Sequence, residues 1–132
     1  MKPIFWFILA IIIIGAGLSL LTKGKKEEIK EKARVKSTES QSKAYQLEAK
    51  ELAKYICSKE HAFFAKNGYF TASKDSLQIL MGRSHYKFDI VSATGIGFKA
   101  KIYGNIDNDD VIDTWFVDQD GKLEHTIDDA VR

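Results

Sequence analysis

Acidic and amide side chains alternate along one short segment, and this is the pattern in the chain with the most obvious chemistry. The segment reads Asn105-x-Asp107-x-Asp109-x-x-x-Asp113. Alternating carboxylates in a tight turn can point several oxygens toward one hard cation, and Ca²⁺ is held by such oxygens. The sequence therefore predicts a calcium site, and calcium is the only cofactor it suggests. The predicted ligands are Asn105, Asp107, Asp109 and Asp113.

The same segment departs from the helix–loop–helix calcium motif at two positions. That motif needs Gly at the sixth position of its loop and Glu at the twelfth, where this chain has Asp110 and Phe116. The alternative is a turn in which Asn and Asp side chains bond their own backbone, while the acidic groups stay solvated without a metal. The residues leave both interpretations open.

The other residues that could take part in catalysis are scattered. Cys57 is the only cysteine and adjoins Ile56 on an apolar helix face, which predicts a buried free thiol; an intermolecular disulfide is the alternative. His61, His85 and His125 share no metal-ligand or catalytic spacing. A Ser-His-Asp order and a glycine-rich phosphate loop are also missing, and a thin sheet on one helix offers little volume for a substrate. We therefore expect neither an enzyme nor a small-molecule substrate.

The residues with candidate chemistry lie among predicted strands. Apolar residues alternate along four runs, over 86–90, 98–102, 115–117 and 123–127. Turn-forming residues separate these runs, at 94–97, 105–110 and 120–121. Because short turns connect consecutive strands, we predict an antiparallel meander of three or four strands.

A long helix is predicted before the strands. Residues 27–66 contain no Pro and no Gly, and Ala, Glu, Lys, Gln and Leu dominate them. Few residues of 27–42 are apolar, so this half is expected to face solvent or a partner. Apolar residues then recur at helical spacing, which predicts a stripe covered by one face of the sheet. The stripe comprises Tyr45, Leu52, Ile56 and Phe63. Asn67-Gly68 supplies a left-handed cap that ends the helix.

An uncharged run over residues 4–21 precedes this helix. A helix of this length spans roughly 27 Å, enough for the hydrocarbon core of a bilayer. Lys23 and Lys25 follow the run as interface residues tend to do. We therefore predict a single-pass membrane anchor, with membrane lipid as a partner. The anchor residues are Ile4, Trp6, Ile11, Ile14, Leu18 and Leu21. A secretory signal cut near Gly17 is the alternative.

Together these elements predict an α+β fold, in which a long N-terminal helix carries a small antiparallel meander on its C-terminal half. The expected organisation is a membrane helix over 1–22, a polar helical stalk over 23–44 and a globular head over 45–132.

Charge is unevenly distributed along the chain. The net charge is only +2, which argues against a dedicated nucleic-acid-binding protein. Residues 104–132, however, hold two basic and nine acidic side chains, whereas residues 23–60 hold eleven basic and seven acidic ones. This asymmetry predicts electrostatic complementarity between neighbouring copies, which would set their register more than their affinity.

Two segments resemble type IV pilins and pseudopilins. Gln41-Ser42-Lys43-Ala44, followed at 62–69 by Ala-Phe-Phe-Ala-Lys-Asn-Gly-Tyr, resembles the helix-to-loop segment of bacterial major pilins. Residues 104–109, Gly-Asn-Ile-Asp-Asn-Asp, run on into Ile112-Asp113-Thr114-Trp115 and resemble a Gly-Asn-Leu-Asp-Gly-Asp strand connection in some of these proteins. The resemblance covers roughly residues 33–124. It implies a pilin-like fold and a membrane-held structural subunit that joins copies of itself or related subunits in a pilus or pseudopilus.

The N-terminus departs from that family. Prepilins carry a Gly-Phe-Thr-Leu-x-Glu-like junction, in which the Gly is the peptidase site and the Glu pairs with a neighbouring subunit's amino terminus. Here Pro3-Ile4-Phe5 has no Gly before it, and the first acidic residue is Glu27. Neither peptidase processing nor the usual assembly contact therefore carries over to this chain.

Two arguments about the membrane topology of the chain conflict. Seven Lys and Arg residues follow the apolar run by position 36, and the positive-inside rule would leave the C-terminal part in the cytoplasm. The resemblance implies the opposite, a head outside the cytoplasmic membrane and possible placement in a cell-surface filament, and we follow it. A membrane-anchored binding module that does not polymerise and a secreted domain remain alternatives to the structural subunit.

Overall fold

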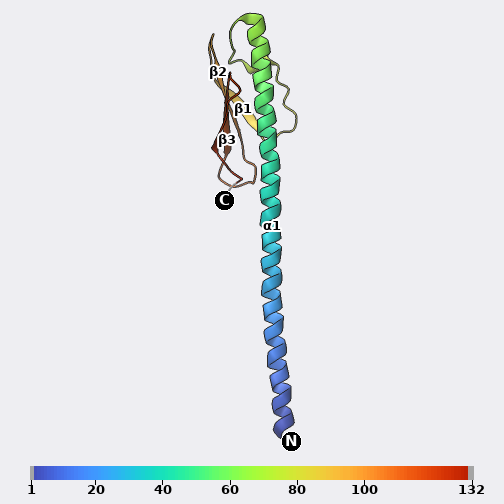
Figure 1. Cartoon of the computed structure of the whole chain (residues 1–132). Coiled ribbons are helices and arrows are strands. Elements are labelled where there is room, and N and C mark those ends of the chain that lie inside the picture. Colours follow the sequence, from blue (N-terminus) through green and yellow to red (C-terminus); the bar gives the residue numbers. More distant parts are fainter. Residues whose placement is uncertain (1, 131–132) are drawn as a thin grey trace. The chain divides into compact units, whose positions relative to one another are not determined.

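The computed structural model describes the backbone of residues 2–130 and the side chains of residues 23–130. The chain begins with helix α1 (Lys2–Asn67), followed by the short helix α2 (Lys74–Leu77). Four strands complete it, namely β1 (Lys87–Ala93), β2 (Phe98–Gly104), β3 (Asp113–Asp118) and β4 (Leu123–Ile127) (Figure 1). The chain divides into two compact units, a first unit of Met1–Thr38 and a second unit of Glu39–Arg132.

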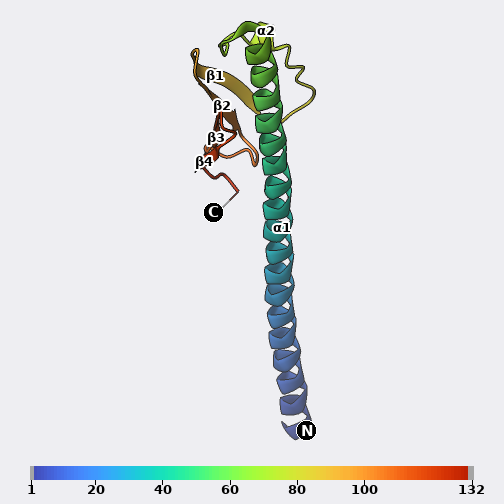
Figure 2. The same cartoon turned by 45° about the horizontal axis from the view of Figure 1, so that its top comes forward.

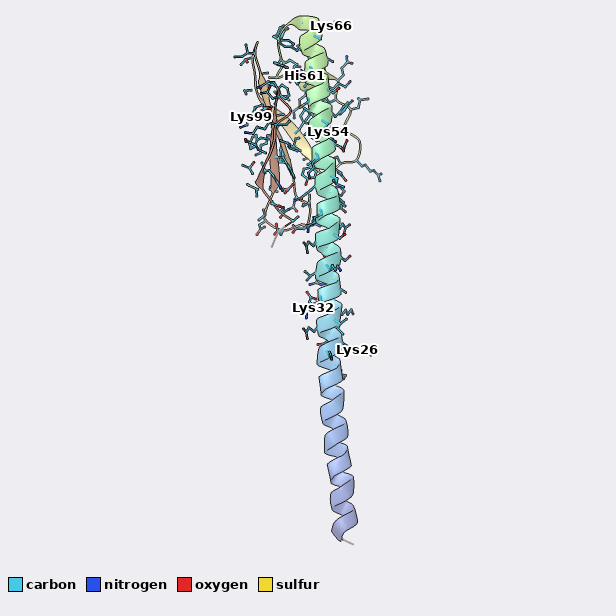
Figure 3. All side chains as sticks on the ribbon, in the orientation of Figure 1. Lys26, Lys32, Lys54, His61, Lys66 and Lys99 are labelled. Atoms are coloured by element: carbon cyan, nitrogen blue, oxygen red, sulfur yellow. The ribbon has the colours of Figure 1, made fainter. Side chains whose placement is uncertain are left out.

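The first unit consists of the amino-terminal part of α1. All its described side chains, over 23–38, are exposed, as the low apolar content of this stretch predicted. Oppositely charged residues one helical turn apart form ion pairs, with 2.6 Å between Lys32 Nζ and Glu28 Oε1 and 2.7 Å between Arg34 Nη2 and Glu31 Oε1. Lys26 and Lys32 mark this stretch in Figure 3. Such exposed pairs support a helix only weakly, so this stretch is held mainly by helix propensity.

The predicted membrane location is wrong on this structure. Among the residues that the structure describes, no helix combines the length and the apolar composition that crossing a membrane requires. In the part of the first unit whose side chains are described, residues 23–38 carry seven basic and three acidic side chains, and this charge is incompatible with the hydrocarbon core of a bilayer. This finding contradicts a single-pass protein of the inner membrane with an extracytoplasmic head. The predicted anchor residues lie outside the residues whose side chains are described; they are Ile4, Trp6, Ile11, Ile14, Leu18 and Leu21.

The second unit contains the predicted meander. Its four strands form one antiparallel sheet in the order β1-β2-β3-β4, so each strand pairs with the next along the chain. Both views show the sheet beside the C-terminal half of α1 (Figures 1 and 2). The register shifts between Ile90 and Ser92 and again between Thr114 and Trp115, and beyond this second shift Ile127 is exposed. The predicted α+β fold, a long helix with a small antiparallel sheet, is confirmed.

One face of the sheet covers the apolar stripe of α1. The helix contributes the predicted Leu52 and Ile56 together with Ala49 and Ala53, and all four side chains are buried. Small side chains at these two positions let the sheet approach the helix closely. The strands contribute Phe88, Phe98, Ala100, Ile102, Trp115 and Val117. Full burial of one large apolar side chain is worth about 1.5–3 kcal/mol, so this layer accounts for most of the packing energy of the unit.

The end of α1 folds back on the helix. Gly68 adopts φ +78° and donates a 2.7 Å hydrogen bond to Phe64 O, which is the predicted left-handed cap. Phe70 then stacks on Phe64, with 4.6 Å between ring centroids, and lies against Phe98 of β2. The backbone N–H of Phe70 also donates to Thr94 O at 3.0 Å. These contacts attach the loop after the helix to the first hairpin of the sheet.

Candidate functional site

The loop between β2 and β3 is held by its own polar side chains. Asn105 Oδ1 accepts a 2.7 Å hydrogen bond from Asn108 N, and Asn108 has φ +64°. Asp107 Oδ1 accepts from Asp109 N at 3.2 Å, and Asp109 Oδ1 accepts from Val111 N at 2.6 Å. The turn described by the alternative interpretation therefore exists.

Gly104 fixes where this loop leaves the sheet. A Cβ atom at this position would collide with the backbone oxygen of His85 on the segment before β1. Gly is therefore required at the end of β2 by close approach of two backbones, and this explains the first residue of the Gly-Asn-x-Asp segment in physical terms.

Asp113, the first residue of β3, is fully buried and saturated with hydrogen bonds. Its Oδ2 accepts from Tyr86 Oη at 2.6 Å and from Trp115 Nε1 at 2.5 Å. Burial alone would raise the pKa of Asp113, but hydrogen bonds, that from Tyr86 foremost, lower it below its ordinary value. Burial and the neighbouring Asp113 carboxylate raise the pKa of the Tyr86 phenol. Asp113 is therefore a buried carboxylate that organises the donors around it.

The second oxygen of Asp113 is equally occupied. Oδ1 accepts from His125 Nε2 at 2.7 Å, from the backbone N–H of Asp129 at 3.0 Å and from Gln46 Nε2 of α1 at 3.3 Å. Sequence spacing gave no sign that His125 would take part, because its partner is twelve residues away on the neighbouring strand. Asp113 thus joins the helix, β3, β4 and the C-terminal segment.

His125 is fixed on both sides of its ring. The ring stacks on Trp115, with 3.6 Å between centroids and 7° between planes. Nδ1 lies 3.7 Å from Asp128 Oδ2, while Nε2 contacts Asp113. Both ring nitrogens therefore face carboxylates of the same molecule, which gives His125 a structural position rather than that of a general base directed at a substrate.

A second acidic cluster joins the β2–β3 loop to the end of the chain. One carboxylate oxygen each from Asp107, Asp109 and Asp129 lies within 4.8 Å of the other two. Asp129 is 1% exposed, and its Oδ2 accepts from Ile106 N at 3.3 Å. Burial raises the pKa of Asp129 against the opposing effect of the Ile106 hydrogen bond, and the charges of Asp107 and Asp109 and a side-chain hydrogen bond with Asp109 raise it further.

The structure thus divides the predicted calcium ligands. It brings Asp107 and Asp109 together, but it places Asp113 in the buried network of Tyr86 and Trp115. The amide of Asn105 is used inside the loop, since Oδ1 accepts from Asn108 N and Nδ2 donates to Asp109 O. Sequence reasoning missed the third acidic member, because Asp129 lies far along the chain. The only signal for it was the acidic composition of 104–132.

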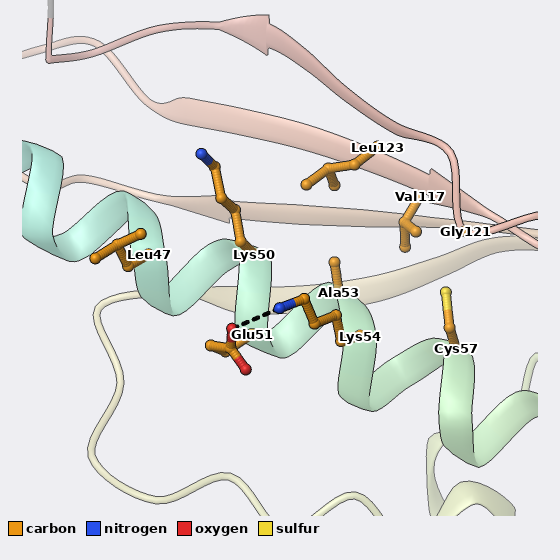
Figure 4. A pocket seen from close by; sticks show the side chains of 9 residues that line it. All are labelled: Leu47, Lys50, Glu51, Ala53, Lys54, Cys57, Val117, Gly121 and Leu123. Carbon is orange, nitrogen blue, oxygen red and sulfur yellow. Dashed lines mark hydrogen bonds and ion pairs between the residues drawn. The ribbon is translucent and has the colours of Figure 1, made fainter.

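A groove of about 450 Å³ lies between α1 and the β3–β4 hairpin. Figure 4 shows its lining residues, which are Leu47, Lys50, Glu51, Ala53, Lys54, Cys57, Val117, Gly121 and Leu123. Its floor is apolar, and Lys54 Nζ pairs with Glu51 Oε1 at 2.9 Å on its rim. Cys57 is a free, half-buried thiol whose Sγ donates to Asp118 O at 3.6 Å. Burial raises the pKa of this thiol, so it is a poor nucleophile at neutral pH.

Glu60 is the other buried carboxylate of α1. It is fully buried beneath the loop that follows the helix, and its Oε2 accepts from Thr71 N at 3.1 Å. Its Oε1 is buried and accepts no hydrogen bond from the residues whose side chains are described. Burial raises the pKa of Glu60. This group therefore favours its protonated form more than an exposed glutamate does.

No protein-family model matches this chain, and no curated protein matches it either.

Proposed function

We propose that this protein is a structural subunit, similar to type IV pilins and pseudopilins, that assembles with copies of itself or related subunits into a filament. The observation that carries the proposal is the contrast along α1. In the second unit the helix is covered by the sheet, whereas every described side chain of the first unit, over 23–38, is exposed. Most helices in proteins are stabilised by packing, so an exposed helix of this length is suited to contacts with neighbouring helices.

The sequence before this stretch supports the same proposal. Residues 4–21 carry no charged side chain, and the backbone of α1 is helical through them. An apolar helical surface of this extent in water favours association with another apolar surface. In a filament, this stretch would pack against the same stretch of neighbouring copies.

Charge supplies the second support. Residues 1–38 hold eight basic and three acidic side chains, whereas residues 39–132 hold twelve basic and fifteen acidic ones. The two units therefore have opposite net charge. Contacts between the basic unit of one copy and the acidic unit of another would fix the stagger of neighbouring subunits.

Assembly of the full chain tests the proposal. The protein is purified in mild detergent, the detergent is removed, and negative-stain electron microscopy with sedimentation measures filament mass. We expect filaments from the unaltered chain and none from the double variant Ile11→Asp and Ile14→Asp, which places charge in the apolar run. Ile96→Asp is the matched control, because Ile96 is 91% exposed in the second unit.

Two results would contradict the proposal. One is a full chain that stays monomeric after detergent removal, which would favour a binding module that does not polymerise. The other is equal filament mass from the Ile11/Ile14 double variant and the Ile96 control, because the apolar run would then have no part in assembly.

A further inference from the structure

We propose that Glu60 is a pH-sensitive latch, whose neutral carboxyl holds the loop 68–73 closed over the end of α1 and whose ionisation releases this loop. The loop joins α1 to α2 (Figure 2). The proposal concerns the second unit alone and does not depend on whether the protein forms filaments. It goes beyond a general loss of stability, because the sheet stays folded while the loop opens.

The Glu60 side chain has hydrogen-bond support on one oxygen only. It is 0% exposed, and the backbone N–H of Thr71 in the loop donates to its Oε2 at 3.1 Å. Its Oε1 is buried without a hydrogen-bond partner among the residues whose side chains are described. Burial of a carboxylate is costly unless its oxygens accept hydrogen bonds, so this position suits the neutral form better than the charged one.

The titratable groups that face Glu60 do not offset its burial. Burial raises the pKa of Glu60, and it outweighs the opposing effects of the Thr71 N–H and of the charge on His61, the next residue of α1. The Cys57 thiol lies one helical turn earlier, and both Glu60 and Asp118 of β3 raise the pKa of this thiol. The negative charge of an ionised Glu60 would therefore meet a second acidic group beyond Cys57.

The helix that follows the loop contributes no compensating cation. Lys74 opens α2, and its Nζ pairs with Asp89 Oδ1 of β1 at 2.5 Å. The neighbouring Asp75 carries the same charge as an ionised Glu60. The ionised latch would thus have the Thr71 N–H as its main support.

The loop has few other attachments, so its opening need not disturb the sheet. The Phe70 N–H donates to Thr94 O at 3.0 Å, and the Phe70 ring lies against Phe64 and Phe98. Residues 68–69 and 72–73 are exposed, which leaves Phe70 as the buried side chain of the loop and Thr71 as a half-buried one. A segment with so little buried surface opens at a lower free energy than a packed sheet.

The sign of the pH dependence follows from this geometry. In the open loop, water solvates both oxygens of ionised Glu60, whereas in the closed loop the charge stays buried. The closed loop is therefore fully favoured below the ordinary pKa of a glutamate, and it loses this advantage as the pH rises through the raised pKa of Glu60. Opening also uncovers the ring of Phe70, which is 6% exposed in the closed loop. A rise in pH thus presents an apolar surface that is hidden in acid.

Amide hydrogen exchange of the full chain tests the proposal. The exchange is resolved by residue with NMR in mild detergent, and protection factors at about pH 5 and about pH 8 are corrected for the intrinsic rate of exchange. We expect the protection of Phe70 and Thr71 to fall at least about fivefold between these pH values, because Glu60 ionises across them. Ile102, buried in the middle of β2, should keep its protection.

Two variants identify the group responsible. Glu60→Gln cannot ionise but keeps an oxygen that accepts from the Thr71 N–H, so we expect equal protection of the loop at both pH values. Glu51→Gln is the matched control, because it removes the same charge from an exposed position of the same helix and should keep the pH dependence of the unaltered chain.

Three results would overturn the proposal. The first is protection of Phe70 and Thr71 in the unaltered chain that stays constant or increases as the pH rises, and this result does not depend on whether a variant folds. The second is an equal fall at Ile102, since the whole unit rather than the loop would then open. The third is a pH dependence that persists in Glu60→Gln, because another group would then control the loop.

Discussion

The hydroxyl of Tyr86 donates a 2.6 Å hydrogen bond to Oδ2 of Asp113, and both side chains are buried although they lie 27 positions apart in the sequence. Tyr86 precedes the first strand and Asp113 opens the third, so this contact spans the sheet. It is charge-assisted, because the lowered pKa of Asp113 keeps the carboxylate ionised at neutral pH. The bond therefore ties the beginning of the sheet to its centre.

Removal of the Asp113 carboxylate is expected to destabilise the second unit. Asp113→Ala leaves the buried donors of Tyr86 and Trp115 without an acceptor, and each such loss costs about 1–3 kcal/mol. We expect the free energy of unfolding to fall by about 3 kcal/mol, measured by urea denaturation followed by tryptophan fluorescence in the presence of a chelator.

Two variants calibrate this prediction. Tyr86→Phe removes one donor and keeps the acceptor, so we expect a smaller loss of about 1 kcal/mol. Asp110→Ala, at an exposed position of the neighbouring loop, should change stability by less than about 0.5 kcal/mol. Equal stabilities of the Asp113 and Asp110 variants would show that the buried carboxylate does not organise the sheet.

Titration of Glu60 is expected to make the stability of the second unit depend on pH. Burial raises the pKa of Glu60 in the folded protein above the ordinary value of a glutamate side chain. The stability linked to its protonated form is therefore fully present below about pH 4.5 and is lost as the pH rises through the raised pKa. We expect Glu60→Gln to exceed the unaltered chain in stability at pH 7 by about 1 kcal/mol and to match it at pH 4.

Urea denaturation at several pH values measures this difference. Glu51→Gln is the matched control, because it changes the same charge at an exposed position of the same helix. A gap between Glu60→Gln and the unaltered chain that does not vary with pH would contradict the prediction, since the effect would then not arise from titration of Glu60.

Assembly is expected to depend on ionic strength. The first unit is basic and the second is acidic, and salt screens attraction between exposed charges. We expect filament mass to fall when NaCl is raised from about 0.05 M to about 0.5 M, as measured by sedimentation. The double variant Lys25→Glu and Lys26→Glu, at two exposed positions, should assemble less at low salt and lose its salt dependence. Filament mass indifferent to both changes would show that charge does not guide the contacts.

The sequence by itself determined the elements of the second unit, because their signals are local. Alternating apolar residues predicted the strands, short turns predicted the meander, and Asn67-Gly68 predicted the end of α1. The helical stripe was predicted to include Leu52 and Ile56, and both are buried. Phe63 was predicted to belong to the same stripe, but its ring makes an edge-to-face contact with Tyr69 of the following loop. Each correct prediction depends on residues within a few positions of one another.

The same locality explains what could not be predicted. Asp107 and Asp109 share one turn, so their proximity follows from the sequence. Asp129 reaches them only after β3 and β4 have returned the chain to the β2–β3 loop, and no local pattern encodes that return. Asp113 stands in the same motif as these two residues, but as the first residue of a strand it turns inward to Tyr86. Which acidic group meets which partner was therefore decided by the pairing of strands across the sheet, because only tertiary packing sets the face on which a distant side chain lies.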